Sequence, residues 1–248
     1  MALLTRGRGP SPSVPRDPEA RMSVIEHLEA LRRALIISIA AWALLTLAAW
    51  FFSAEAVTLL IHRAGLNTVV YLSPTGAFLL RFKVALYAGF VAAAPVIFWQ
   101  VWWFVSPGLY RHEKRIILPL IAATSAFFLL GVGFALFALP LFMHVLTSFA
   151  PPDLHFLPVG DDLLSFVLAL VIAFGIVFEM PVILWTLGML RIITTRWLYK
   201  NHAYWIVGLG LLANVMTPGL DPLTPLIVFI PLVFFWEGTA LLLKLSGR

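Results

Sequence analysis

Six long apolar segments occupy most of this chain, and they constrain its fold more than any other feature. A bilayer core of about 30 Å is crossed by about 20 helical residues. Of the 248 residues, 61% are hydrophobic and 12% are charged, whereas a soluble domain is about half apolar and about a quarter charged. We therefore predict an all-α integral membrane protein with six transmembrane helices, over 34–52, 75–104, 116–143, 163–190, 203–217 and 223–243.

The last two expected spans are short. The fifth has 15 residues, which is about 22 Å at 1.5 Å per residue. The sixth contains Pro225 and Pro231, which limit its regular helical length. We expect such a pair to thin the bilayer locally.

Lysine and arginine are distributed very unevenly between the two ends of the expected spans. Six lie at or before Arg33, three after the second span, three after the fourth and two after the sixth, so 14 of 17 share one side. The exceptions are Arg63, Arg81 and Lys83. Basic loops stay in the cytoplasm, so we predict that both termini are cytoplasmic. Basic residues beside apolar spans also indicate anchoring at a membrane surface rather than binding of nucleic acid.

Composition and motifs exclude several classes of function. Cysteine is absent, so the chain has no disulfide framework and no thiol nucleophile. We find no P-loop, H-E-x-x-H or G-x-S-x-G motif, and the histidines are scattered; we therefore expect no enzyme activity, no cofactor and no metal. Residues 1–21 are rich in Pro, Arg and Ser, which predicts a disordered tail before a single six-helix transmembrane domain over 22–248.

Glu179 is the most costly residue of the apolar segments. It lies 12 residues before Arg191, so about 18 Å from that end of its helix and near the bilayer centre. A charged side chain there costs roughly 2.5–3.5 kcal/mol on insertion scales and has to face protein or a water-filled cavity. Pro181 can kink the helix beside it. Two interpretations stay open: a neutral glutamic acid hydrogen-bonded between helices, or a functional pocket. Glu237, seven residues from Lys244, can snorkel.

Two segments on the predicted cytoplasmic side combine acids with bases. Residues 26–33 form an amphipathic pattern that leads into the first span, with Glu29 and Arg33 four apart. The loop over 104–115 turns at Pro107 and carries one acid, Glu113, among its basic residues. An interfacial helix and a topology anchor explain most of these residues, but neither explains Glu113.

Three polar residues bracket a tight turn between the last two spans. They are Asn214, Thr217 and Thr224, around residues 218–222. Polar groups at the ends of short adjacent helices can bind another helix in lipid. The alternative is that they cap their own helices.

Five strings of this chain together resemble the TatC family, the multispanning subunit of the twin-arginine protein translocase. They occupy residues 26–33, 94–102, 104–115, 173–181 and 217–221, in family order. The resemblance implies a curved, concave arrangement of six helices in the bacterial cytoplasmic (inner) membrane. It also implies a receptor and scaffold, driven by the proton-motive force, for export of folded proteins that carry two consecutive arginines in their signal peptide.

The resemblance further assigns roles to residues. Signal-peptide binding falls on Glu29, Arg32, Phe104, Pro107, Tyr110, Glu113 and Arg115. Glu179 and Pro181 belong to an intramembrane pocket. Docking of the single-span partners TatA and TatB falls on Asn214, Thr217, Asp221 and Thr224. The partners implied are therefore twin-arginine signal peptides, TatA/TatB-type proteins, further copies of the chain itself and membrane lipid.

The chain departs from the family pattern at one position. The usual opening is His-Leu-x-Glu-Leu-Arg, but Ala30 stands where the family has its acid, and Glu29 precedes it. One step turns a side chain by about 100° around a helix, so Glu29 is not an equivalent substitute. A second class of function, a proton-coupled small-solute transporter with Glu179 as its relay, stays open, although the two halves of the chain show no inverted repeat.

Overall fold

The computed structural model describes residues 24–106, 116–151, 153, 156–217 and 223–246. These residues form helices and one isolated parallel β-bridge, between Val70 and Val159, so the all-α prediction is confirmed. The helices are α1 (Val24–Phe51), α2 (Ser53–Arg63), α3 (Gly76–Val105), α4 (Ile117–Thr147), α5 (Gly160–Met189), α6 (Thr195–Lys200), α7 (His202–Met216) and α8 (Leu223–Leu245). The predicted tail lies outside the described residues.

Five of these helices, namely α1, α3, α4, α5 and α8, are long and apolar enough to cross a membrane. Helix α7 coincides with the fifth expected span, and its 15 residues make it the shorter apolar helix. Helix α1 begins ten residues earlier than expected, at Val24, because the amphipathic segment 26–33 continues into the first span without a break. The short helices α2 and α6 were not predicted.

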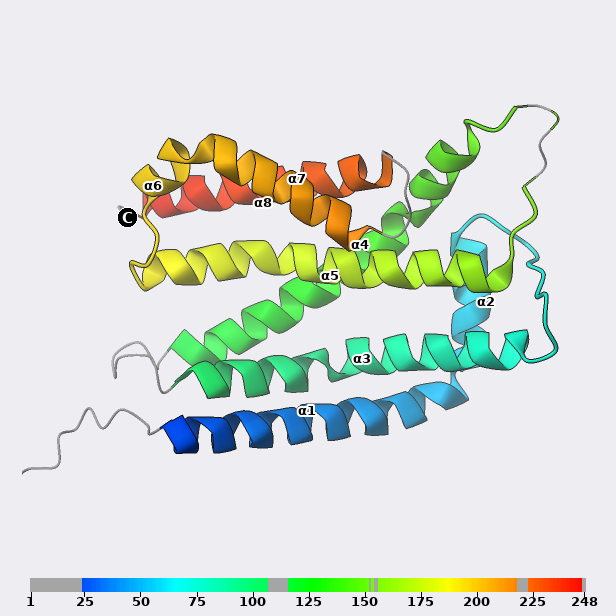
Figure 1. The fold of residues 1–248 in the computed structure, drawn as a ribbon, viewed down its shortest axis with the longest axis horizontal. Coiled ribbons are helices and arrows are strands. Elements are labelled where there is room, and N and C mark those ends of the chain that lie inside the picture. Colours follow the sequence, from blue (N-terminus) through cyan, green and yellow to red (C-terminus); the bar gives the residue numbers. More distant parts are fainter. Residues whose placement is uncertain (1–23, 107–115, 152, 154–155, 218–222, 247–248) are drawn as a thin grey trace, which may run out of the picture.

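The long helices run back and forth along the long axis of the molecule (Figure 1). Helix α3 packs on α1 and α4, α5 packs on α4 and α8, and α7 packs on α8. Helix α4 crosses the others obliquely, and α2 lies across one end. We call the end at which α1 begins and α8 ends the terminal end, and the opposite end the distal end. Both described ends of the chain therefore lie on one side, as the charge pattern predicts, while the assignment of that side to the cytoplasm stays a prediction.

Helices α7 and α8 do not extend as far as their neighbours. In Figure 1 their distal ends stop short of the distal ends of α3 and α5. The 15 residues of α7 agree with the short fifth span expected from the sequence, whereas the expectation of a short sixth span is wrong: α8 has 23 residues, includes Pro225 and Pro231, and is long enough to cross a membrane. Local thinning of the bilayer by this part of the fold stays a prediction.

Helix α5 lies at the centre of the fold, and α1 lies at its edge. In the most apolar part of α5, 61% of the residues are buried, whereas none is buried in that of α1. Helix contacts are closest at two glycines. A Cβ added to Gly89 of α3 would lie 2.5 Å from the Cα atom of Thr46, and one added to Gly131 of α4 would lie 2.3 Å from the carbonyl oxygen of Phe174. Glycine thus allows direct backbone contact between α1 and α3 and between α4 and α5.

Two of the three cations that depart from the charge bias are bound within the distal end. Lys83 of α3 forms a 2.5 Å ion pair with Asp161 of α5 and donates to the Ser165 hydroxyl at 2.8 Å. Arg81 donates from Nε to the Ser53 hydroxyl at 3.1 Å. These bonds tie α3 to α5 and to the start of α2, which gives both cations a structural role on the side where the charge bias disfavours them.

Candidate functional site

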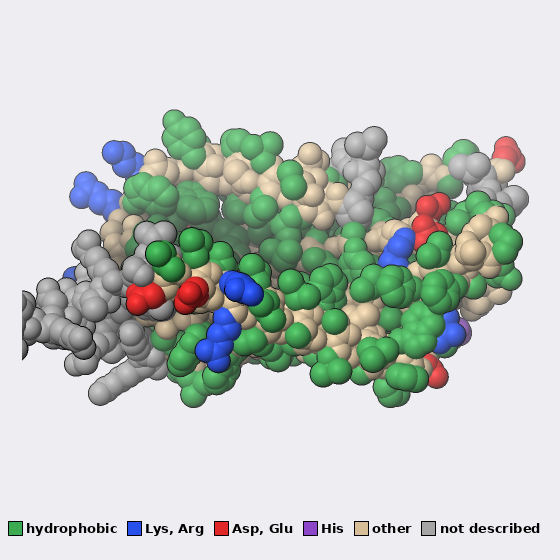
Figure 2. All heavy atoms as spheres, turned by 60° about the horizontal axis from the view of Figure 1, so that its bottom comes forward, with side chains coloured by type: hydrophobic (Ala, Val, Ile, Leu, Met, Phe, Trp, Pro, Cys, Tyr) green, Lys and Arg blue, Asp and Glu red, His purple; other side chains and the backbone are tan. Residues whose placement is uncertain are grey.

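The start of α1 packs against the end of α3 at the terminal end. The rings of His27 and Phe104 stack with centroids 4.4 Å apart. This contact brings the segment 26–33 to the point where the chain enters the loop over 107–115. Charged side chains gather over the start of α1, while hydrophobic side chains cover most of the same face further along (Figure 2).

Of the seven residues predicted to bind the signal peptide, three lie in the described part of the chain. Glu29 and Arg32 are exposed on α1, and Phe104 is half-buried on α3. Glu29 forms no ion pair with any residue that the structure describes. Pro107, Tyr110, Glu113 and Arg115 lie outside the described residues. Ala30 is half-buried beside the exposed Glu29, in agreement with the expectation that the two positions point in different directions.

Glu179 lies in the central helix and faces protein. Its side chain is only 6% exposed, and the carboxyl group interacts with the backbone of Phe128 on α4. Among the described residues, its Oε1 atom has no hydrogen-bond partner. Gly175, one turn earlier, lets the Phe128 ring approach the α5 backbone, since a Cβ there would lie 2.6 Å from that ring. The acid therefore sits one turn from a close α4–α5 contact, and one of its oxygens has no partner among the described residues.

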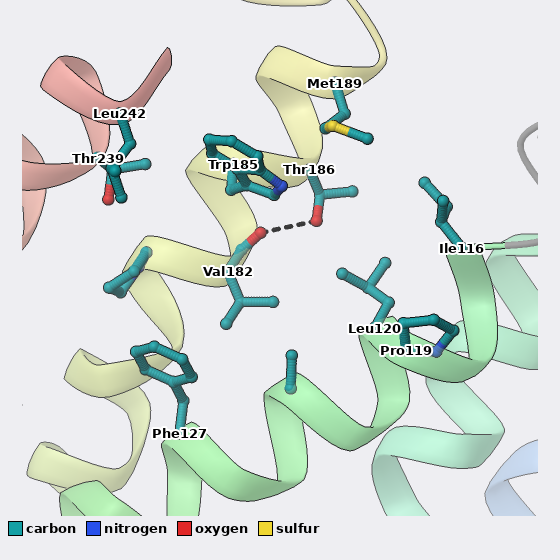
Figure 3. Close-up of a pocket in the computed structure, with 12 residues that line it drawn as sticks. Ile116, Pro119, Leu120, Phe127, Val182, Trp185, Thr186, Met189, Thr239 and Leu242 are labelled. Carbon is teal, nitrogen blue, oxygen red and sulfur yellow. Dashed lines mark hydrogen bonds between the residues drawn. The ribbon is translucent and has the colours of Figure 1, made fainter. Parts of the chain in front are cut away.

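An apolar cavity of about 320 Å³ lies next to Glu179 along α5, on the side of the terminal end (Figure 3). Helices α4, α5 and α8 line it with Ile116, Pro119, Leu120, Ala123, Phe127, Pro181, Val182, Trp185, Thr186, Met189, Thr239 and Leu242. The Thr186 hydroxyl donates to the Val182 carbonyl at 2.6 Å, and the Thr239 hydroxyl donates to the Phe235 carbonyl at 2.7 Å. Because its hydroxyls are satisfied within their own helices, the cavity suits apolar groups. Pro181 lines it, but Glu179 does not.

The polar residues at the distal ends of α7 and α8 point in different directions. Asn214 is exposed on α7. Thr217 is 7% exposed and donates to the Ala213 carbonyl at 3.1 Å, so it closes its own helix. Thr224 is fully buried within the chain, and Asp221 lies outside the described residues. Of the three described residues, Asn214 alone has an exposed side chain.

Sequence reasoning missed a contact between α6 and α8. The sequence suggested that Glu237 snorkels; in the structure its carboxylate is hydrogen-bonded to Tyr199 of α6. Burial, and then the charge and hydrogen bond of Glu237, raise the pKa of Tyr199 above its usual value. The neighbouring Trp236 is fully buried, with the Tyr199 ring 6.0 Å away. No local pattern indicates this pair, because α6 itself was not predicted.

A family model described as Sec-independent protein translocase protein (TatC) matches residues 26–231. The chain is 37% identical over 235 residues to the TatC protein of Aquifex aeolicus, covering 92% of this chain and 97% of that protein. It is 33% identical over 226 residues to the TatC protein of Carboxydothermus hydrogenoformans, covering 90% and 93%.

A solved structure agrees with these sequence matches. A crystal structure described as the twin-arginine translocase receptor TatC superimposes with a TM-score of 0.76 at 35% identity, covering 90% of this chain and 100% of that one. The TatC family model matches well over half of the chain, and the two TatC relatives are covered over nearly their whole length. The chain therefore belongs to the TatC family of Sec-independent protein translocase subunits.

Proposed function

We propose that this protein is the signal-peptide receptor and scaffold of a twin-arginine translocase. It binds signal peptides with two consecutive arginines at its terminal end, which faces the cytoplasm. It docks single-span TatA/TatB-type partners at the edge formed by α7 and α8. The assembled complex exports folded proteins across the bacterial inner membrane, driven by the proton-motive force.

The contact between His27 and Phe104 is the observation that carries this proposal. Stacking at 4.4 Å brings the acidic start of α1 beside the end of α3, from which the chain continues into the segment that contains Glu113. The two guanidinium groups of a twin-arginine signal peptide are always charged, and each can bind a carboxylate in bidentate geometry. An exposed interface keeps the desolvation cost of such pairs low. The planar fork, rather than the charge, then distinguishes arginine from lysine.

The apolar part of the signal peptide follows the arginines into the membrane. Figure 2 shows a hollow lined by hydrophobic side chains between the α1 side and the edge at which α7 and α8 lie. Both Glu179, with its unsatisfied Oε1 atom, and the cavity beside Pro181 lie within the half of the fold built by α4, α5 and α8. We propose that the inserted signal peptide, or a partner helix, supplies the group that satisfies Glu179.

Binding of a labelled twin-arginine peptide to the purified protein in detergent tests the receptor role. We expect saturable binding to the twin-arginine peptide and roughly tenfold or weaker binding to a twin-lysine peptide, since a charged hydrogen bond contributes about 1.5–3 kcal/mol. Glu113→Ala should weaken binding by a similar factor. Equal binding of both peptides to both proteins would contradict the proposal.

Ala30 gives this test an internal control. If the parent protein binds neither peptide, Ala30→Glu should restore binding of the twin-arginine peptide, because it returns the carboxylate to the family position. Absence of binding to Ala30→Glu as well would exclude the receptor role.

The short helix α7 predicts a dependence of export on helix length. Four leucines inserted between Leu211 and Leu212 lengthen α7 by about 6 Å, which removes the mismatch that thins the bilayer. We expect export of a twin-arginine reporter to fall, measured as processed reporter outside the cytoplasm. Gly-Ser-Gly-Ser inserted before His202 adds the same number of residues without lengthening the apolar span, and it should leave more export intact. Unchanged export after the leucine insertion would exclude thinning by α7.

The alternative function is a proton-coupled small-solute transporter that uses Glu179 as its relay. It rests on the burial of that acid alone. Such a transporter would take up solute in a Glu179-dependent way and would ignore signal peptides. Vesicles that contain the purified protein and an imposed pH gradient would distinguish the two functions.

A further inference from the structure

A second apolar groove, remote from the cavity on α4, α5 and α8, runs along the contact between α1 and α3. It encloses about 590 Å³ and is lined by α1 from Ile39 to Trp50 and by α3 around Phe78 and Phe82. Trp50 follows Ile39 by eleven positions, so the groove is about 16 Å long. That length is close to the thickness of one leaflet, half of a hydrocarbon core of about 30 Å. Its dimensions thus match an extended acyl chain.

The side chain of Arg81 lies at the distal end of this groove. The guanidinium carbon of Arg81 lies 5.0 Å from the centroid of the Trp50 ring, and Trp50 lines the groove. The Nε atom donates to the Ser53 hydroxyl at 3.1 Å, which fixes the plane of the guanidinium. Arg81 has no carboxylate partner within the part of the chain that the structure describes. Both terminal nitrogens therefore remain available to an anion.

The depth of Arg81 is that of the membrane interface. It follows the start of α3 by five residues, about 7.5 Å along the axis, and Trp50 is the last residue but one of α1. The Trp50 and Phe78 rings meet edge to face with centroids 5.5 Å apart. Aromatic side chains gather at this level of a bilayer, where lipid phosphate groups also lie.

We propose that this groove binds one phospholipid of the distal leaflet, with its phosphate on Arg81 and an acyl chain between α1 and α3. At this depth the guanidinium lies at the level of the lipid phosphates, and its planar fork matches the oxygens of a phosphate. A phospholipid matches both features, because its acyl chain fits an apolar groove one leaflet long and its phosphate fits the cation at the distal end of that groove. Lys83, two residues further along α3, is by contrast already paired with Asp161.

Native mass spectrometry of the purified, delipidated protein tests the proposal. The probes are dioleoylphosphatidylglycerol and dioleoylglycerol, which have the same chains but differ in the phosphate headgroup. We expect one phosphatidylglycerol to bind the parent protein tightly and dioleoylglycerol to bind roughly tenfold or more weakly, given about 1.5–3 kcal/mol for charged hydrogen bonds. Arg81→Gln should weaken phosphatidylglycerol binding by a similar factor, and Arg81→Lys should restore part of it. Arg63→Gln, which removes a distal cation outside the groove, should have no effect.

A second pair of variants tests the groove itself. Ala43 is exposed and lines the groove, whereas Ala48 is exposed on the opposite face of α1. Ala43→Phe should abolish the tight phosphatidylglycerol site, and Ala48→Phe should retain it. Equal loss in Arg81→Gln and Arg63→Gln, or equal binding of the two lipids, would overturn the proposal. It would also be overturned if Ala43→Phe changed the oligomeric state or the retention of a partner helix while lipid binding stayed intact.

Discussion

Gly131→Leu should prevent the protein from folding stably, and this is the largest effect that we expect of a single substitution. The added Cβ would lie 2.3 Å from the Phe174 carbonyl oxygen, 2.8 Å from its carbon and 2.9 Å from the Phe178 Cβ atom. Two of these atoms belong to the α5 backbone, so the clash is relieved only by moving a whole helix. Overpacking of a core costs about 1–3 kcal/mol and occasionally more, and we expect this variant at or above the upper value.

Gly133 provides the matched control for this substitution. It lies on the same helix, two residues away, and a Cβ there meets nothing within 4 Å. Gly133→Leu should therefore express and melt like the parent protein. The measurement is the Tm and the fraction of monodisperse protein in detergent for both variants. Equal melting of Gly131→Leu and Gly133→Leu would show that α4 and α5 are not in the close contact described here.

Glu179→Gln should abolish most export while leaving the fold intact. Glutamine retains the size and hydrogen-bonding capacity of the side chain, but it cannot ionise or release a proton. The acid is 6% exposed, and its Oε1 atom lacks a partner among the described residues, so its charge is not needed to hold α4 against α5. We expect export to fall roughly tenfold or more, because losing one hydrogen bond to a charged group costs about 1.5–3 kcal/mol.

The measurement is export of a twin-arginine reporter, with protein level and Tm determined in parallel. Thr186→Val is the matched control, because Thr186 is a buried polar residue of the same helix that donates to the carbonyl of Val182. It should retain nearly full export. Full export in Glu179→Gln would show that neither the signal peptide nor a partner helix depends on this acid. Export that falls together with the Tm would instead assign Glu179 to the fold.

Much of the membrane architecture follows from the sequence. Each expected span coincides with a helix, and the largest difference is the early start of α1. The chain ends lie at one end of the fold, as the uneven distribution of lysine and arginine predicts. These features are local, because a helix is selected by the bilayer through its own length and hydropathy, and the flanking charges orient it. The depth of Glu179 is likewise a matter of counting residues from the end of its helix.

The sequence could not reveal which face of each span meets protein. Lipid tails and the protein interior are both apolar, so hydrophobic side chains do not distinguish the two surroundings. Only the tertiary structure shows that α5 is central, that Gly131 touches the α5 backbone and that Thr224 is buried rather than turned toward a partner. The same holds for the groove beside Arg81, which combines residues of α1 and α3 that lie 28 or more positions apart in the sequence. Sequence therefore determined where the apolar helices lie along the chain, whereas close packing of small residues decided how they fit together.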